Sequence, residues 1–136
     1  MPRTESQIRR MHAILLIDHG SRRADANALL TEVVSRVKAR VGGDTIVEAA
    51  HMEIAEPTIA QGFARCVEQG ASLVVAHPFM LAPGRHVQED LPRLVAEAAT
   101  LHLGVSFVLA APLGSHDGVI DAVVDRCRAA LPADEG

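Results

Sequence analysis

Four short runs of aliphatic residues alternate with four longer stretches of helical periodicity, and this alternation limits the possible folds more than any other feature. The aliphatic runs cover residues 13–17, 45–50, 72–79 and 105–110. Strands that alternate with helices are typical of a parallel sheet wrapped by helices, and a chain of 136 residues suits one such domain. The sequence therefore predicts an α/β fold, a three-layer sandwich in which helices flank a four-stranded parallel sheet.

We expect residues 12–131 to form this single domain and the polar residues 1–11 to form a flexible N-terminal extension. Each helical stretch repeats apolar residues three or four positions apart, which places them on one face. Pro57 suits the first position of the second helix, Pro92 is tolerable only in the first turn of the third, and Asp117 is a candidate cap for the fourth. The expected apolar faces are, in chain order, Leu29, Val33, Val37 and Val41; Ile59, Phe63 and Val67; Leu91, Leu94, Val95 and Ala98; and Val119, Ile120, Val123, Val124 and Cys127.

Charge and cysteine content exclude several classes of protein. The net charge is −4 and the charges are intermixed, so the chain lacks the basic stripe of a nucleic-acid binder. No apolar run is long enough to span a bilayer, and residues 1–11 lack the apolar stretch of a signal peptide. Cys66 and Cys127 each fall within the apolar pattern of an expected helix, which favours buried, reduced thiols. We therefore expect a cytoplasmic protein with no nucleic-acid or membrane partner.

Polar side chains follow each of the four expected strands. The carboxyl ends of parallel strands meet at one edge of a sheet, and ligands bind there because loops and helix N-termini converge. Five of the seven histidines lie at or just beyond these strand ends. The residues expected at this edge are Asp18, His19, Gly20, Ser21 and Arg22; His51, Glu53 and Glu56; Pro83, Gly84, Arg85, His86 and Glu89; and Gly114, Ser115 and His116.

Three residues of this edge form the candidate reactive set: His19, Glu53 and His86. Histidine and glutamate side chains presented from different strand ends bind divalent first-row metals or transfer protons near neutral pH. Taken alone, His19 is better explained as a histidine that orders the turn before Gly20. The combination with Glu53 and His86 favours chemistry instead, although their long spacing leaves their convergence open.

Each of the other polar residues near the candidate reactive set has two possible interpretations. His51 either supports the reactive set or is a solvated histidine at a strand end, and Asp18 either orients His19 or anchors the turn. His77 lies within an apolar run, where a core histidine with satisfied hydrogen bonds is the usual case. His116 reaches the same edge but is more typical of a turn.

The edge also carries groups that suit an anionic substrate. Arg22, Arg23 and Arg85 bring cationic groups to this edge beside expected helix N-termini, which favours carboxylates or phosphates. Arg23, and with it Arg22, is alternatively a solvated residue at the helix start, whereas Arg85 is better placed between Gly84 and His86. A hydrolase in which His19 activates Ser21 is a weaker alternative, because the Gly-x-Ser-x-Gly elbow is absent. The first turn also lacks the glycine and lysine patterns of dinucleotide and nucleoside triphosphate sites.

Four stretches resemble the small class II chelatases that insert a metal into sirohydrochlorin on the way to sirohaem or cobalamin. They are DHGSR at 18–22, HMEIAEPTI at 51–59, HPFMLAPGRHVQEDLPRL at 77–94 and APLGSHDGVIDAVVDR at 111–126. Together they extend over nearly the whole chain, and the set is specific although HGS by itself is not. The chain looks closest to the sirohydrochlorin ferrochelatase and cobaltochelatase branch, which has a three-layer α/β fold.

The resemblance implies a lyase-class enzyme that inserts a divalent metal and releases two protons. It assigns His19, His86 and Glu53 to binding the metal or accepting protons. It also implies that Ser21, Arg22 and Arg85 bind the carboxylates of sirohydrochlorin. No organic cofactor is needed. Fe(II) is slightly preferred over Co(II), and Ni(II) shares the same ligand types.

The resemblance also implies a homodimer. Larger family members hold two such domains in one polypeptide, and a tetrapyrrole is too broad to be enclosed by one small sheet edge, so a two-fold dimer is expected. A noncatalytic carrier of a tetrapyrrole or a metal is the alternative, since it would keep the binding edge without turnover.

Overall fold

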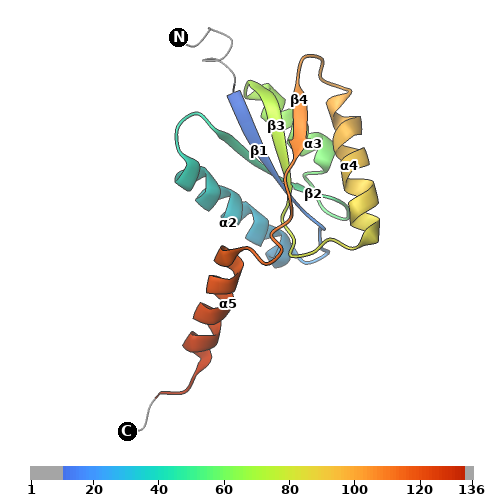
Figure 1. Cartoon of the computed structure of the whole chain (residues 1–136). Coiled ribbons are helices and arrows are strands. Elements are labelled where there is room, and N and C mark those ends of the chain that lie inside the picture. Colours follow the sequence, from blue (N-terminus) through green and yellow to red (C-terminus); the bar gives the residue numbers. More distant parts are fainter. Residues whose placement is uncertain (1–10, 134–136) are drawn as a thin grey trace.

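A computed structural model describes residues 11–133 of the chain. Figure 1 shows strands and helices in strict alternation, as the sequence predicts. The extension expected over residues 1–11 lies outside the described residues, apart from Met11, which begins the first strand. None of the described helices has the length and apolar character needed to cross a membrane. The elements are β1 (Met11–Asp18), α2 (Ala24–Val41), β2 (Ile46–His51), α3 (Ile59–Glu68), β3 (Ala71–Pro78), α4 (Arg85–Ala99), β4 (Ser106–Leu109) and α5 (Asp117–Ala130).

The sheet has four parallel strands in the order β2-β1-β3-β4, which confirms the predicted α/β fold. β1 lies inside the sheet, where Leu15 is paired with Glu48 of β2 and with Ala76 of β3. Because all strands run in one direction, their carboxyl ends meet at one edge, the lower one in Figure 1. We call it the carboxyl edge, and it consists of residues 18–22, 51–57, 79–86 and 110–116.

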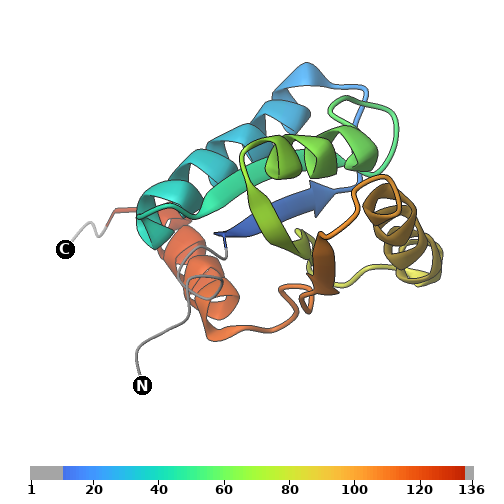
Figure 2. The same cartoon turned by 90° about the horizontal axis from the view of Figure 1, so that it is seen from above.

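The face of the sheet covered by α3 and α4 carries the main core (Figure 2). Successive residues of a strand point to opposite faces, so every second side chain of β1 and β3 enters this core. Leu15, Phe63, Val74 and Val95 are fully buried in it. Burial of one such side chain stabilises the fold by roughly 1.5–3 kcal/mol, so this face holds the sheet rigid behind the carboxyl edge.

The opposite face is covered by α2 over β1 and β2, where Leu30 packs with Leu16 and Val47. The apolar face predicted for this helix is wrong at both ends, because Leu29 is 56% exposed and Val41 is 44% exposed. Residues four positions apart are rotated by about 40° around a helix, so a strict four-residue repeat drifts away from the sheet. The stripe that packs is Leu30, Val33, Val34 and Val37.

The rest of this second face forms an apolar groove of about 320 Å³. We call it the open groove; its lining residues are Ile14, Leu16, Val33, Val37, Val75, His77, Phe79, Ala110 and Leu113. The Nδ1 atom of His77 is buried and has no hydrogen-bond partner among residues 11–133. The expectation of a satisfied core histidine is therefore wrong, because the strand directs His77 to apolar neighbours. Burial lowers the pKa of His77.

Helix α3 begins later than predicted. The Thr58 hydroxyl accepts a hydrogen bond from the Gln61 N–H at 3.2 Å, and the Gln61 side chain accepts one from the Thr58 N–H at 2.8 Å. This reciprocal cap satisfies two N–H groups that a helix end leaves free. The helix therefore begins at Ile59, and Pro57 lies outside it.

Helices α4 and α5 also differ from expectation at their starts. α4 begins at Arg85, so Pro92 lies in the helix interior rather than in its first turn. For α5, the cap is His116, whose Nδ1 accepts the Gly118 N–H at 2.9 Å, and Asp117 is the first helical residue. The imidazole reaches the free N–H group that the carboxylate was expected to bind.

The position of α5 departs most from the sequence prediction. Figure 1 shows α5 projecting beyond the carboxyl edge, and none of its residues is buried. Its expected buried face is exposed, including Cys127, because α5 makes no extensive packing with the other described elements. Cys66 is buried as expected, and burial together with the charge of Glu48 raises the pKa of its thiol to about 12.

Candidate functional site

A buried histidine joins the ends of β1 and β2 at the carboxyl edge. The Nδ1 of His51 lies 2.5 Å from Oδ1 of Asp18, and the His51 side chain is only 3% exposed. The backbone continues this pairing, because the Met52 N–H donates to the Asp18 carbonyl at 2.9 Å and the Glu53 N–H donates to the His19 carbonyl at 3.2 Å. Asp18 therefore anchors His51 and the following turn, rather than His19.

Gly20 allows the two chain segments to approach closely. Its φ of +93° is one that side chains with a Cβ rarely adopt, and a Cβ atom there would lie 1.9 Å from the carbonyl oxygen of Glu53. Directly before this glycine, His19 Nε2 lies 3.3 Å from Glu53 Oε1. The side chains of this pair are 51% and 46% exposed. The structure thus brings together two of the three residues of the predicted reactive set, in contact with solvent.

The third residue, His86, lies in the first turn of α4. Its Nδ1 is 2.9 Å from Oδ2 of Asp90, and its side chain is 65% exposed. A carboxylate that accepts the proton of one imidazole nitrogen leaves the other nitrogen free to bind a metal, and metal-binding histidines usually have such a partner. The sequence reasoning missed Asp90, although its position four residues after His86 places both on one face of a helix.

The three residues do not form one cluster in a single copy of the chain. In residues 11–133, no group of three or more histidine, cysteine, aspartate and glutamate side chains is close enough to hold a metal ion. Besides the Asp18–His51 pair, the carboxyl edge presents two separate histidine–carboxylate pairs whose histidines are exposed, His19 with Glu53 and His86 with Asp90. Their use as one set stays a prediction.

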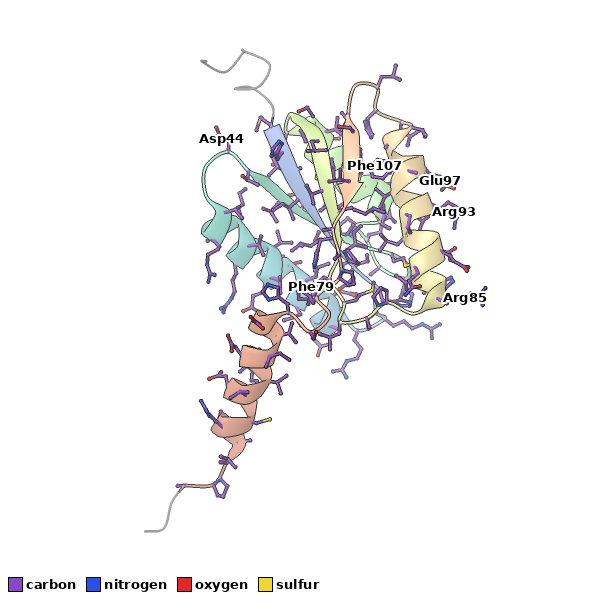
Figure 3. All side chains as sticks on the ribbon, viewed as in Figure 1. Asp44, Phe79, Arg85, Arg93, Glu97 and Phe107 are labelled. Atoms are coloured by element: carbon purple, nitrogen blue, oxygen red, sulfur yellow. The ribbon has the colours of Figure 1, made fainter. Side chains whose placement is uncertain are left out.

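The candidate groups for an anionic substrate differ in how they are held. Arg85 stands at the start of α4 (Figure 3) with its side chain 92% exposed, and its Nε contacts Oε1 of Glu89 at 3.1 Å. Arg22 is exposed and lies three residues after His19 in the sequence. Ser21 is fixed in the turn, because its hydroxyl accepts the Arg23 N–H at 3.0 Å. No hydrogen bond joins that hydroxyl to His19 in the described part of the chain, so the geometry does not support the hydrolase alternative.

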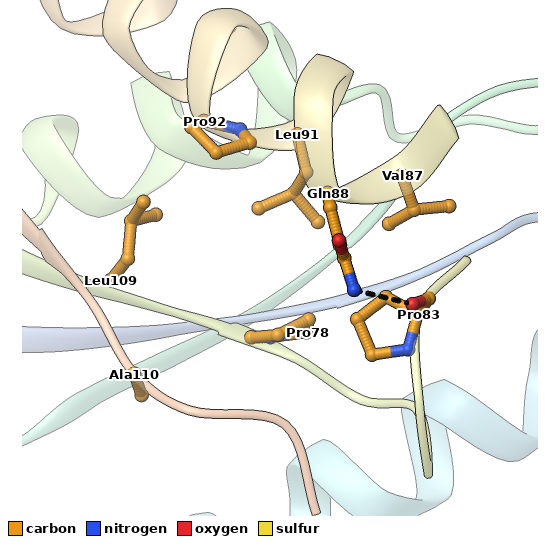
Figure 4. Close-up of a pocket in the computed structure, with 8 residues that line it drawn as sticks. All are labelled: Pro78, Pro83, Val87, Gln88, Leu91, Pro92, Leu109 and Ala110. Carbon is orange, nitrogen blue, oxygen red and sulfur yellow. Dashed lines mark hydrogen bonds between the residues drawn. The ribbon is translucent and has the colours of Figure 1, made fainter. Parts of the chain in front are cut away.

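An apolar pocket of about 130 Å³ lies at the same edge, beneath the first two turns of α4 (Figure 4). The side chain of Gln88 closes one side of it by donating to the carbonyl of Pro83 at 3.1 Å. The pocket is lined by Pro78, Pro83, Val87, Gln88, Leu91, Pro92, Leu109 and Ala110. The edge therefore combines an apolar hollow with exposed arginine and histidine side chains, which suits a ligand with a flat apolar body and anionic arms.

Comparison with known proteins gives the family. The CbiX family model matches residues 13–130. The chain belongs to the CbiX family. It is 48% identical over 123 residues to the chloroplastic sirohydrochlorin ferrochelatase of Arabidopsis thaliana, covering 90% of this chain and 54% of the relative. It is 33% identical to the sirohydrochlorin cobaltochelatase of Methanococcus maripaludis, covering 85% of this chain and 97% of the relative.

A solved structure supports the same assignment. The sirohydrochlorin chelatase SirB from Bacillus subtilis subspecies spizizenii, solved in complex with cobalt, matches with a TM-score of 0.79 and 32% identity, covering 88% of this chain and 51% of that one. This CbiX family chain thus spans about half the length of the Arabidopsis and Bacillus relatives, and nearly all of the Methanococcus relative.

Proposed function

We propose that this CbiX family chain is a sirohydrochlorin chelatase, a lyase-class enzyme that inserts Fe(II) or Co(II) into the tetrapyrrole and releases two protons. The observation that carries the proposal is the contact between His19 Nε2 and Glu53 Oε1 at an open, partly apolar edge. The names of the relatives support the substrate, since the Arabidopsis and Methanococcus proteins are named sirohydrochlorin chelatases.

His19 and Glu53 are proposed to receive the pyrrole protons. Metal insertion exchanges two N–H protons of the ring for one divalent ion, so a base must stand beside the ring nitrogens. A neutral imidazole takes a proton near neutral pH, and the Glu53 carboxylate, 3.3 Å away, stabilises the imidazolium that results. Both side chains are about half exposed, so the proton can pass on to water.

His86 is proposed to present the metal to the ring, with His19 and Glu53 as further ligands before insertion. Its contact with Asp90 through Nδ1 leaves Nε2 as the free nitrogen. Imidazole and carboxylate ligands suit Fe(II), Co(II) and Ni(II) alike, so the ligand types do not determine which metal is inserted. The 48% identity with a protein named ferrochelatase supports iron as the first choice.

Substrate carboxylates are proposed to bind Ser21, Arg22 and Arg85 at the rim of the site. A guanidinium binds a carboxylate through two parallel N–H bonds, and the exposure of Arg85 leaves it free to exchange Glu89 for a substrate arm. The apolar pocket under α4 would receive part of the ring edge.

Assembly and location complete the proposal. We infer a homodimer, because one carboxyl edge leaves both histidine–carboxylate pairs open to solvent. A cytoplasmic role in sirohaem or cobalamin synthesis is supported by the free state of Cys66 and Cys127, which suits a reducing compartment.

The test is an anaerobic assay in which sirohydrochlorin is mixed with Fe(II) or Co(II) and the absorbance change is followed with and without the protein. We expect clear acceleration over the spontaneous rate, lost in His19→Ala and in His86→Ala. The matched control is His12→Ala, which removes an exposed histidine near the opposite end of β1. Absence of acceleration by the unmodified protein would contradict the proposal. Tight tetrapyrrole binding without acceleration would identify a carrier instead.

A further inference from the structure

We propose that Ile54 is a substrate-binding residue, an apolar side chain that the turn after β2 holds in water so that it contacts the tetrapyrrole ring beside Glu53. The inference rests on the proposed function and adds to it a residue outside the candidate reactive set. It starts from a mismatch at Ile54 between the conformation of the backbone and the type of side chain.

The backbone at Ile54 has a conformation that isoleucine rarely adopts. Its φ is +74°, and no other residue except glycine has a positive φ in the described part of the chain. A side chain branched at Cβ is strained in this left-handed region, where glycine and asparagine are the usual residues. The Ala55 N–H donates to the Glu53 carbonyl at 2.8 Å, so Ile54 is the central residue of a tight three-residue turn. The strain therefore lies in the turn that carries Glu53.

Contacts on both sides of Glu53 impose this turn. The Glu53 N–H donates to the His19 carbonyl at 3.2 Å, and a Cβ at Gly20 would lie 1.9 Å from the Glu53 carbonyl oxygen. The His51 N–H donates to the Pro57 carbonyl at 2.7 Å, so the chain must also return to the end of β2 within a few residues. Strained residues persist where the surrounding structure determines the conformation in this way, and they are concentrated at functional sites.

The Ile54 side chain contributes little to the core of the fold. It is 61% exposed, and it belongs to neither of the two apolar clusters that the described residues form. An isoleucine stabilises a fold through the apolar area that it buries, and here most of that area faces water. A glycine would satisfy the turn without strain. Ile54 thus destabilises the free chain, and we assign its side chain to a contact outside the fold.

The surroundings of Ile54 indicate where this contact is made. Ile54 directly follows Glu53, whose carboxylate lies 3.3 Å from His19 Nε2. A second exposed apolar residue, Leu81, is 59% exposed and follows β3. The strand order β2-β1-β3 places the segment with His19 between the segments with Ile54 and Leu81. The ends of the two outer strands are about 10 Å apart, a span that a tetrapyrrole ring covers.

A tetrapyrrole is the ligand that these features fit. Its nitrogen atoms lie at the centre of a flat, apolar ring, and its carboxylates lie at the ends of flexible arms. A ring whose nitrogens stand beside His19 and Glu53 therefore brings its apolar body to the neighbouring Ile54. An Fe(II) or Co(II) ion has no apolar surface, so Ile54 should affect the binding of the tetrapyrrole and not that of the metal.

The first experiment measures the binding of metal-free sirohydrochlorin to the whole chain by anaerobic absorbance titration. Ile54→Asn should raise the dissociation constant about tenfold, the factor expected for the loss of an apolar contact of this size. Ile54→Leu keeps an apolar side chain of the same volume and should bind nearly as tightly as the unmodified chain. The matched control is Leu103→Asn, which replaces a 99% exposed leucine before β4, at the amino end of the sheet. It should leave the dissociation constant unchanged.

Urea unfolding separates the contact from the turn. Ile54→Gly removes both the side chain and the strain, whereas Ile54→Ala keeps a Cβ at a positive φ. Ile54→Gly should therefore unfold at a higher urea concentration than Ile54→Ala, although both should bind sirohydrochlorin about tenfold more weakly than the unmodified chain. A glycine variant less stable than the alanine variant would show that the turn is not strained, and would overturn the inference.

The metal-insertion assay gives a readout that a purely structural role would not. Ile54→Asn should raise the KM for sirohydrochlorin about tenfold and leave kcat and the KM for the metal unchanged, because a contact made equally in the ground and transition states acts on binding alone. If Ile54 only supported the turn, displacement of Glu53 would lower kcat at saturating sirohydrochlorin.

Unchanged tetrapyrrole binding in Ile54→Asn, equal weakening in Leu103→Asn, or an effect confined to kcat would each overturn the inference. These outcomes differ from failure of the proposed function. Tetrapyrrole binding that depends on Ile54, without any metal insertion, would support the contact and contradict the chelatase. Normal metal insertion with an unchanged KM in Ile54→Asn would overturn the contact and leave the chelatase standing.

Discussion

Two histidine–carboxylate pairs are built from the same two strand ends, with the partners reversed. β1 supplies the aspartate and β2 the histidine of the Asp18–His51 pair, whereas His19 follows β1 and Glu53 follows β2 in the other pair. The His51 and Asp18 side chains are 3% and 22% exposed, and those of His19 and Glu53 are 51% and 46% exposed. Neighbouring residues of one turn are thus divided between the interior and the solvent.

The difference in exposure indicates that the two pairs have different roles. An exposed ion pair contributes only about 0–1 kcal/mol to stability, so the contact of His19 with Glu53 does little to hold the fold. Removal of one partner from a buried pair leaves the other desolvated and unpaired, which is strongly destabilising. The Asp18–His51 pair therefore holds the two strand ends together, and the His19–Glu53 pair is free for chemistry.

The largest expected effect comes from removing the exposed pair. His19→Ala should lower the rate of metal insertion by about 10²–10⁴-fold, the usual contribution of a general base. Glu53→Ala should also slow it, and the double variant should be scarcely slower than His19→Ala, because the two groups act on the same protons. Metal-insertion rates of the three variants and the unmodified chain test this. Effects that multiply independently would show that the residues have separate roles.

The next largest effect is expected at the turn that separates the two pairs. Gly20→Ala would place a Cβ 1.9 Å from the Glu53 carbonyl at a φ of +93°, so the strand ends must move apart. We expect a loss of about 3 kcal/mol in the free energy of unfolding, together with a fall in activity. Gly84→Ala is the control, since a Cβ there meets nothing within 4 Å. Urea unfolding of both variants measures the effect. Equal stability of the two variants would contradict the inference that this turn requires a glycine at position 20.

The turn also shows what the sequence could predict and what it could not. Strand and helix order follow from local periodicity, and the polar residues after each strand locate the carboxyl edge. The contact between Gly20 and the Glu53 carbonyl joins residues far apart in sequence, so no spacing reveals it. For the same reason the sequence could not identify His51 as the partner of Asp18, and it left open whether Asp18 orients His19 or anchors the turn.

Other errors have local causes that a sharper analysis of the sequence could avoid. The start of α3 is signalled by Thr58 and Gln61, a capping pair three residues apart. The apolar stripe of α5 lies where the sequence predicts it, but its residues are not buried as expected. Amphipathicity shows that a helix face needs a partner; it does not show whether that partner belongs to the same copy.

A smaller effect is expected from the buried pair. Asp18→Ala should lower the free energy of unfolding by about 2 kcal/mol, since His51 would be left buried without its acceptor. Glu53→Ala, the matching truncation in the exposed pair, should change it by less than about 1 kcal/mol. Chemical unfolding of the two variants under the same conditions compares them directly. If both lost the same stability, the division between a structural pair and a chemical pair would fail.

The smallest effect concerns His77, a half-buried histidine whose Nδ1 atom is buried and has no hydrogen-bond partner in the described chain. Burial lowers its pKa, and no other lining residue of the open groove is acidic or basic. A histidine whose pKa is lower in the folded state stabilises the fold fully above its unfolded pKa of about 6.5, and this contribution is lost as the pH falls through the window below that value. His77→Leu should therefore reduce the loss of stability on acidification below about pH 6.5. Thermal unfolding at several pH values, with His12→Leu as the exposed control, measures the difference. If stability fell with pH equally steeply in His77→Leu and in the unmodified chain, the His77 imidazole would have to be in contact with solvent. His77 would then not differ from the histidines that are paired with carboxylates.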